Sequence, residues 1–142
     1  MSTSSIGAID RLDRTRQQHA FKAVRRWAEG KSDLKDIVTE LKGLPVQLRT
    51  QGLVHTWATQ LKGEQKKRAS LAVDLLENIT DWLCDKDNVA VAGVIGAELD
   101  ARGLLARAIE MDNFHYRIVQ REALAYAGVL KLLSEAWEKG DG

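Results

Sequence analysis

Apolar residues recur every three or four positions along most of this chain, and this spacing predicts amphipathic helices rather than strands. The first helix is expected to end at Gly30, and its apolar face consists of Ile9, Leu12, Ala20, Val24 and Trp27. That apolar stripe is weak across residues 14–18. A second helix, which Ser32 or Asp33 can cap, is expected to stop at Gly43. Its apolar face consists of Leu34, Ile37, Val38 and Leu41.

Residues 44–61 contain the most distinctive arrangement of helix-starting and helix-ending residues in the sequence. Pro45, the only proline, fits the first turn of a helix, where its missing N–H leaves no bond unmade. Gly52 fits a left-handed cap that ends this short helix. A new apolar pattern begins at Leu53 and closes at Gly63. The segment therefore predicts a helix, a glycine break and a second helix.

The second half of the chain continues the helical pattern with one interruption. Residues 64–84 read as a long helix whose apolar face consists of Leu71, Leu75, Leu76, Ile79 and Leu83. Residues 85–88 form a turn, and residues 89–97 admit either a short helix or an irregular strand. Helices at 100–111 and from 114 to about 137 follow, and Asp112 or Asn113 can cap the last one.

The overall prediction is an all-α, compact bundle of about six or seven helices in a single domain. A chain of 142 residues can bury a core, and we expect the helical domain to occupy residues 8–138 between flexible tails at 1–7 and 139–142. Cys84 is the only cysteine, which excludes an intrachain disulfide and a cysteine zinc cluster. The first residues lack the apolar core of a signal peptide, and no apolar run approaches the roughly 20 residues that span a bilayer. We therefore expect a cytoplasmic protein without membrane contact.

Charge is segregated along the chain, although the formal net charge is only +1. Residues 1–68 carry fourteen Lys and Arg against seven Asp and Glu, whereas residues 69–100 carry one against seven. A protein with such a basic half can bind a polyanion there. The segregation is equally consistent with self-assembly, in which the acidic stretch of one copy meets the basic half of the next.

The first candidate contacts for nucleic acid lie on the first helix. Arg11, Arg14, Lys22 and Arg25 fall on one of its faces, and Arg26 adjoins them. Such a row can neutralise successive phosphates and release their counterions. The alternative is a solvated helix face whose cations pair with Asp10, Asp13 and Glu29.

Further candidate contacts are Lys66, Lys67, Arg68 and Arg49. The first three stand near a helix start, where cations oppose the helix dipole, and this placement favours an external anion. Arg49 stands near a helix end, where a cation is favourable without any partner.

Patterns typical of catalysis or metal binding are missing from the sequence. His19, His55 and His115 have no ligand spacing, and the glycines at 93 and 96 lack the spacing of a phosphate-binding loop. We expect no catalytic residue, no cofactor and no metal. The four tryptophans fit core packing better than base stacking.

One set of carboxylates keeps an enzymatic hypothesis open. An acidic stripe at helical spacing consists of Asp74, Glu77, Asp81 and Asp85, and Asp87 follows it. Paired carboxylates can hold a divalent metal, so a small metal-dependent hydrolase is a competing hypothesis. A solvated or partner-facing surface fits the stripe better.

Two stretches resemble the small helical subunit of type III-B CRISPR interference complexes, the Cmr complex. The first consists of Leu44, Pro45, Leu48, Gln51, Gly52, Leu53, Thr56, Ala58 and Leu61. The second consists of Tyr116, Glu122, Ala123, Leu124, Tyr126, Leu130, Lys131 and Ala136. The chain departs from the family pattern where Gln120 replaces a threonine, Val129 an aromatic residue and Leu132 an arginine, which weakens any RNA contact from the last helix.

The resemblance implies a non-catalytic small subunit of an RNA-guided antiviral ribonucleoprotein complex. Copies of the chain would stack in a filament and help to hold guide RNA and target RNA, while other subunits of the CRISPR complex supply cleavage. Because base pairing reads the sequence, such a subunit needs only backbone contacts. The alternatives are a helical protein–protein adaptor without nucleic-acid contact and the small subunit of a related type I or type III complex.

Overall fold

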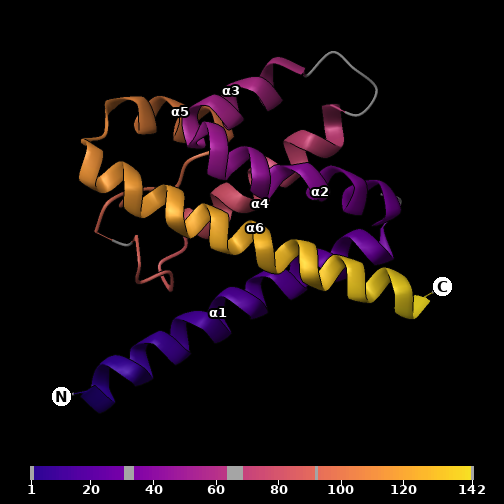
Figure 1. Ribbon diagram of the computed structural model, residues 1–142, viewed down its shortest axis with the longest axis horizontal. Helices are drawn as coiled ribbons and strands as arrows, with labels where there is room; N and C mark the ends of the chain where they lie inside the picture. The colour runs from indigo at the N-terminus through magenta and orange to yellow at the C-terminus, as the bar shows by residue number, and fades with distance from the viewer. Residues whose placement is uncertain (1, 31–33, 64–68, 92, 142) are drawn as a thin grey trace.

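The computed structural model describes residues 2–30, 34–63, 69–91 and 93–141, and within these ranges the chain is helical and contains no strand (Figure 1). The six helices of this part are α1 (Ser2–Glu29), α2 (Leu34–Gln51), α3 (Leu53–Lys62), α4 (Ala69–Cys84), α5 (Ala101–Glu110) and α6 (Asn113–Asp141). The prediction of an all-α bundle is therefore confirmed. α1 and α6 include residues 2–7 and 139–141, where the sequence pattern predicted tails.

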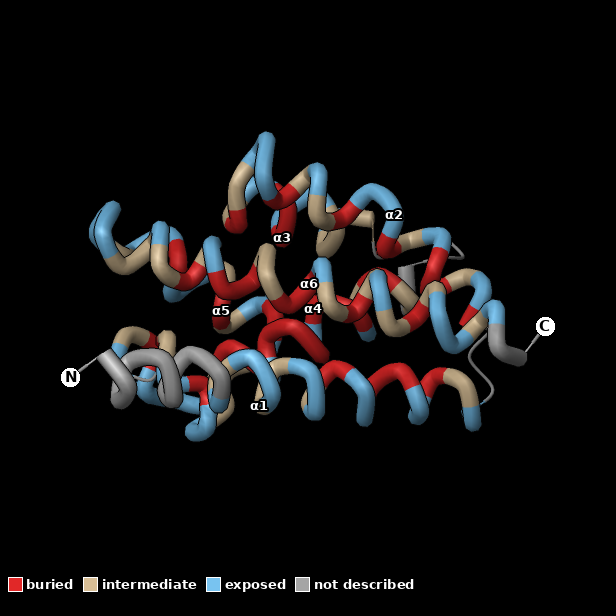
Figure 2. Tube along the Cα trace, turned by 60° about the horizontal axis from the view of Figure 1, so that its bottom comes forward, coloured by how far each residue is buried: buried red, intermediate tan, exposed pale blue. Residues whose placement is uncertain are grey.

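The longest helix, α6, lies between the other long helices. It packs along α1 and α2 and also contacts α4. Figures 1 and 2 show α1 and α2 on opposite sides of α6. α3 completes the bundle by packing on α4 and α5. Since α6 contacts neighbours on several sides, its side chains are the ones that can connect distant parts of the sequence.

The core draws on large side chains from most of the helices. Trp27, Trp57 and Trp82 are 4%, 0% and 0% exposed, so the prediction that tryptophans pack in the core is confirmed for these three. Trp137 is 38% exposed. Among residues 11–29 of α1, the buried residues run from Ala20 to Trp27, beside α6, as the red segments in Figure 2 show.

The predicted break at Gly43 and the helix start at Pro45 are wrong. α2 runs without interruption from Leu34 to Gln51, with Pro45 inside it. An interior proline removes one hydrogen bond and costs about 3 kcal/mol. The apolar face continues across it, however, because Leu41, Leu44 and Leu48 are all buried, and each buried leucine contributes roughly 1.5–3 kcal/mol. Packing of this face therefore outweighs the local effect of proline.

The predicted break at Gly52 is confirmed, but the glycine is not in the left-handed helical conformation. Its φ of 89° and ψ of 168° belong to a region that essentially only glycine adopts. Its N–H donates to the Leu48 carbonyl, and its own carbonyl accepts from Thr56 N–H. Gly52 thus ends α2 and begins α3 within a single residue.

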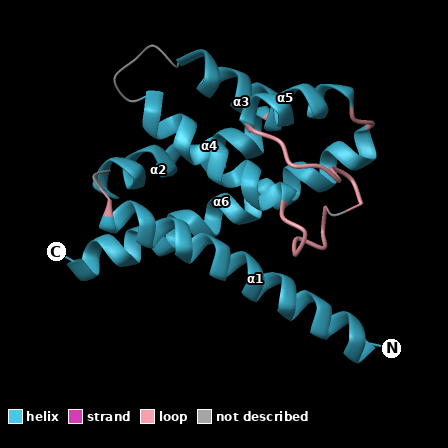
Figure 3. Cartoon of the chain, turned by 180° about the vertical axis from the view of Figure 1, so that it is seen from behind, coloured by secondary structure: helices cyan, strands magenta, loops and turns pink. Residues whose placement is uncertain are grey.

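Residues 85–100 form a loop, shown in pink in Figure 3, so the predicted short helix or strand at 89–97 is wrong in the part that the structure describes. The loop is anchored because Val91 and Ile95 are buried and Arg107 Nη2 donates to the Ile95 carbonyl at 3.1 Å. The glycine-rich composition of residues 93–96 serves turns rather than a regular element. The predicted start of the preceding helix at residue 64 lies outside the described residues. Of the described helices, none is both long and apolar enough to cross a bilayer.

Candidate nucleic-acid interface

A row of cations lies on the outer side of α1. Arg11, Arg14, Lys22 and Arg25 are all exposed, and an α-helix brings residues at this spacing to one side. At 1.5 Å per residue the row extends about 21 Å. We call these four residues the basic row.

Most of the basic row is unpaired. Among the residues whose side chains the structure describes, no carboxylate lies in ion-pair distance of Arg11, Arg14 or Lys22. Arg25 Nη2 lies 2.9 Å from Glu29 Oε1, but both side chains are more than half exposed, and such surface pairs contribute little. The alternative, in which Asp13 pairs with this face, is not observed, because Asp13 bonds to Arg16 instead. The row can therefore meet an external anion without breaking a strong internal contact.

The remaining candidate cations are not part of the same row. Arg26 is exposed but its Nη2 donates to Asn78 Oδ1 at 3.2 Å, which directs it toward α4. Arg49 is exposed near the end of α2, which lies across α6 from α1 (Figure 2). Lys66, Lys67 and Arg68 fall outside the described residues. The structure thus brings together four of the nine predicted residues.

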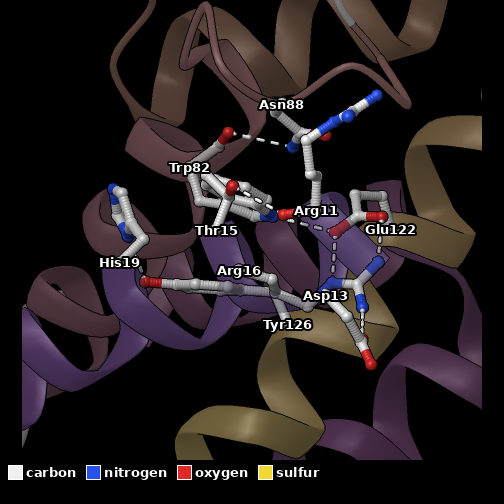
Figure 4. Close-up of polar contacts among 9 residues, drawn as sticks. All are labelled: Arg11, Asp13, Thr15, Arg16, His19, Trp82, Asn88, Glu122 and Tyr126. Carbon is white, nitrogen blue, oxygen red and sulfur yellow. Dashed lines mark hydrogen bonds and ion pairs between the residues drawn. The ribbon is translucent and has the colours of Figure 1, made fainter. Parts of the chain in front are cut away.

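The inner side of α1 carries a different kind of arginine. The Arg16 side chain is 13% exposed, and its Nε and Nη2 donate to the two carboxylate oxygens of Glu122 at 2.7 and 2.8 Å (Figure 4). Glu122 Oε2 also accepts from Trp82 Nε1 at 2.8 Å. The hydrogen bonds to Glu122 raise the pKa of Arg16. This contact joins α1, α4 and α6.

A second buried contact lies one turn further along α1. Asn78 Nδ2 donates to the Tyr126 hydroxyl at 2.7 Å, and the same hydroxyl is hydrogen-bonded to His19 Nδ1, 2.5 Å away. His19 Nε2, in turn, lies 2.9 Å from Asp81 Oδ2. Both ring nitrogens are therefore used inside the protein. Burial raises the pKa of Tyr126, so the hydroxyl keeps its proton.

We call this set of contacts the three-helix network; it consists of Arg16, His19, Asn78, Trp82, Glu122 and Tyr126. The sequence patterns did not identify it. One signal was present, because the apolar stripe of the first helix is weak across residues 14–18, where Arg16 faces inward. A second signal in the sequence is that an acid, Glu122, lies within the apolar stripe of α6. An inward arginine and an inward glutamate on two predicted helices would have suggested a pair.

The acidic stripe does not assemble a metal site in the described part of the chain, where no group of three His, Cys, Asp or Glu side chains is close enough to hold an ion. Two of its members have internal partners, since Glu77 accepts from the Ala101 N–H and Asp81 bonds to His19. Asp81 also lines a hollow of about 680 Å³, together with Asp85 and the nearby Asp87, beside Glu98 and Lys86. Such a lining disfavours an anionic ligand.

The two stretches that carry the family resemblance meet at Gly52. The Tyr116 hydroxyl accepts from Val54 N–H at 2.9 Å, and Gln120 Oε1 accepts from Leu53 N–H at 3.2 Å. Gln120 also donates to the Leu48 carbonyl at 3.4 Å. Side chains of α6 thus cap the start of α3 and the end of α2, which explains why a glycine and a tyrosine far apart in sequence belong to one pattern.

Comparison with known families gives a match over most of the chain. The model of a family described as CRISPR-associated protein (Cas_Cmr5) matches residues 12–137. The matched range includes the basic row except Arg11, and it includes both stretches that meet at Gly52. Neither the curated proteins nor the solved structures gave a match.

Proposed function

The chain belongs to the Cas_Cmr5 family, the small subunit of the type III-B Cmr CRISPR complex, and on that premise we propose that it helps to hold guide RNA and target RNA through backbone contacts without catalysing their cleavage. The resemblance noted from the sequence is thereby confirmed at the level of the family. RNA contact, filament assembly, the non-catalytic role and a cytoplasmic location are parts of the proposal.

One observation supports the RNA contact above the others. Arg11, Arg14 and Lys22 are exposed on one side of α1, and none has a carboxylate partner among the side chains that the structure describes. Each such cation can neutralise a phosphate and release counterions. Phosphate contacts of this kind position an RNA without reading its sequence, which suits a complex whose specificity comes from base pairing.

The other candidate cations have secondary places in the proposal. Arg25, the last member of the basic row, already contacts Glu29, and the neighbouring Arg26 already contacts Asn78. Arg49, Lys66, Lys67 and Arg68 remain candidates for a separate contact. We propose guide RNA, target RNA, other subunits of the complex and further copies of the chain as partners, and no cofactor.

The test compares two triple variants in the reconstituted complex. Arg14→Ala, Lys22→Ala and Arg25→Ala remove three cations from the basic row. The matched control Lys42→Ala, Lys86→Ala and Lys139→Ala removes three exposed cations elsewhere and changes the net charge equally. We expect the first variant to weaken target-RNA binding about tenfold or more at low salt and the control to change it less than threefold. Equal affinities for the two variants would refute the RNA contact.

The same experiment addresses the second candidate, a protein–protein adaptor. An exposed apolar patch that includes Phe21, Leu132 and Trp137 favours a protein partner. If the row variant binds RNA normally but the complex fails to assemble when Leu132 is changed to Glu, the adaptor is the better description.

A further inference from the structure

A series of hydrogen bonds connects an exposed cation to an exposed carboxylate through the interior of the bundle. Arg26 Nη2 donates to Asn78 Oδ1 at 3.2 Å, and Asn78 Nδ2 donates to the Tyr126 hydroxyl at 2.7 Å. This hydroxyl lies 2.5 Å from His19 Nδ1 (Figure 4), and His19 Nε2 lies 2.9 Å from Asp81 Oδ2. Asn78 and Tyr126 are 6% and 0% exposed, so the middle of the series is closed to water. The two ends are open to it, because Arg26 is exposed and the Asp81 side chain is 74% exposed.

The two ends determine the direction of the hydrogen bonds between them. A guanidinium only donates, so Arg26 requires the Oδ1 of Asn78 on its side and turns Nδ2 toward Tyr126. A carboxylate only accepts, so the Nε2 of His19 that faces Asp81 carries a hydrogen. Burial raises the pKa of Tyr126, so its hydroxyl keeps its proton. Within the described residues, this hydrogen has an acceptor only when His19 Nδ1 is bare, which is the neutral form of the ring.

A charged His19 ring does not fit this arrangement. Its Nδ1–H would donate to the Tyr126 hydroxyl, whose own hydrogen would then need another acceptor. Asn78 can supply one only by turning its amide over, which would point Nδ2 at the Arg26 guanidinium and oppose two donors. Arg26 in its present place therefore favours the neutral ring. Asp81 favours the charged ring, but water around its exposed side chain weakens the attraction.

Other charged groups on the three helices around His19 do not change this conclusion. The full set consists of Arg16, Lys22, Asp81, Asp85 and Glu122. Arg16 and Glu122 neutralise each other, the two aspartates favour the charged ring, and the exposed lysine opposes it. None of these groups bonds to Asn78 in the described structure, so the orientation of its amide depends on Arg26.

Arg26 also lies between two hollows of opposite charge. The inner hollow, between α1 and α4, has a volume of about 480 Å³, and its charged lining consists of Arg26, Asp74, Glu77 and Asp81. The outer hollow, also of about 480 Å³, is lined by Lys22, Arg25, Arg26, Glu29 and Gly30. Three cations against one carboxylate suit a phosphate in the outer hollow. Because Arg26 lines both hollows, rotation of its side chain can move the guanidinium from one to the other.

We propose that Arg26 leaves Asn78 when an RNA phosphate enters the outer hollow, and that His19 then takes up a proton. The freed Asn78 amide turns over, and the Tyr126 hydroxyl rotates its hydrogen from His19 Nδ1 to Asn78 Oδ1. A proton from solvent binds the vacated Nδ1. Linkage is reciprocal, so acid strengthens RNA binding by the same factor by which RNA strengthens proton binding. This inference rests on the proposed function, since it names a proton-linked control of the RNA contact.

Nitrogen NMR of the full chain tests the direction of the hydrogen bonds. In the wild-type protein without RNA at pH 7.5, we expect one hydrogen on the His19 ring, at Nε2. The carboxylate introduced by Asn78→Asp can accept from Arg26 and from Tyr126 at once. We therefore expect hydrogens on both ring nitrogens of His19 in this variant at the same pH. The same number of ring hydrogens in the two proteins would overturn the proposal.

RNA binding by the reconstituted complex at pH 6 and pH 8 tests the coupling. One proton taken up by each contacting copy permits a gain of up to about tenfold per pH unit. We expect the gain at pH 6 to be about threefold or more larger for the wild-type chain than for His19→Gln. The amide in His19→Gln accepts from Tyr126 and donates to Asp81 without titrating. The matched control His55→Gln removes an exposed histidine from α3 and should keep the wild-type gain.

Two results of the binding experiment would overturn the coupling. One is an equal gain for the wild-type chain and for His19→Gln, and the other is a gain that survives Arg26→Ala. Both leave the proposed function intact if the triple variant of the basic row still loses RNA binding. If that triple variant binds RNA normally, the proposed function and this inference fail together.

Discussion

Arg14 and Arg16 lie two residues apart on α1 and face opposite environments. Arg14 is exposed with no ion-pair partner among the described side chains, whereas Arg16 is 13% exposed and held by both oxygens of Glu122. Two residues turn an α-helix by about 200°, so adjacent arginines can serve the outside and the inside of the same bundle. The count of cations in a sequence therefore says less about RNA binding than their direction does.

Substitutions on the inner and outer sides of α1 should change the free energy of unfolding by different amounts. Removing one partner of a buried, hydrogen-bonded pair leaves an uncompensated charge and costs about 3–5 kcal/mol. Replacing an exposed, unpaired cation changes stability by at most about 0.5 kcal/mol. The inner side should thus govern the free energy of unfolding, and the outer side should govern binding.

The largest effect is expected for Glu122→Ala. The substitution leaves Arg16 and the Trp82 N–H without a partner in the core, so the free energy of unfolding should fall by about 3–5 kcal/mol. Urea denaturation followed by circular dichroism measures the change. Glu98→Ala removes an exposed carboxylate and should change the value by less than about 0.5 kcal/mol. A loss below 1 kcal/mol for Glu122→Ala would show that the buried pair is not needed for the fold.

A pair of glycine substitutions should give the next largest difference. At Gly52 an added Cβ lies 3.2 Å from the Tyr116 hydroxyl at a φ of 89°, so Gly52→Ala should cost about 1–3 kcal/mol. At Gly43, inside α2, an added Cβ meets nothing, so Gly43→Ala should stabilise by about 0.5–1 kcal/mol. Thermal unfolding of the two variants side by side is the measurement. Two changes of the same sign would contradict the different roles given to these glycines.

The glycines also show how far the sequence could predict this fold. The helical type of the elements followed from the apolar periodicity, and the break at Gly52 followed from its place between two apolar patterns. The error at Pro45 arose because the preference of proline for the first turn of a helix was given more weight than the apolar stripe that runs through Leu41, Leu44 and Leu48. Tertiary packing overrode local preference there.

The candidate interface was predictable only in part. Helical spacing placed Arg11, Arg14, Lys22 and Arg25 on one side of α1 without knowledge of the fold. The inward orientation of Arg16 depends on its hydrogen bonds to Glu122, which is 106 residues away in the sequence. Likewise, the cap that Tyr116 provides for α3 is a contact between distant segments. Contacts of this kind require the tertiary arrangement, which periodicity does not contain.

Alkaline pH should lower the free energy of unfolding through the buried hydroxyl of Tyr126. Burial raises the pKa of this hydroxyl above its ordinary value of about 10, so above pH 10 the unfolded chain loses a proton that the folded chain keeps. The stabilisation is complete below pH 10 and is lost at about 1.4 kcal/mol per pH unit as pH rises. Urea unfolding at pH 9, 10 and 11 should give a shallower fall for Tyr126→Phe. Parallel curves would show that Tyr126 does not titrate differently in the folded state.

The smallest effect on stability is expected on the outer side. Arg14→Ala should change the free energy of unfolding by less than about 0.5 kcal/mol, because the side chain is exposed and unpaired. Arg16→Ala should cost about 3–5 kcal/mol, since it leaves Glu122 buried without its partner. The two variants differ in position by one turn or less, so they form a matched pair in denaturation experiments. Similar losses would remove the distinction between the two sides of α1.

The most direct test of the division between the two sides is the salt dependence of RNA binding by the assembled complex. Affinities are measured over a series of salt concentrations for the wild-type chain and for the variant with Arg14→Ala, Lys22→Ala and Arg25→Ala. If these three residues contact phosphates, the slope of log affinity against log salt should become shallower by about 2 for each copy that contacts RNA, because each lost contact removes about 0.7. An unchanged slope in a complex that still contains the small subunit would contradict the account.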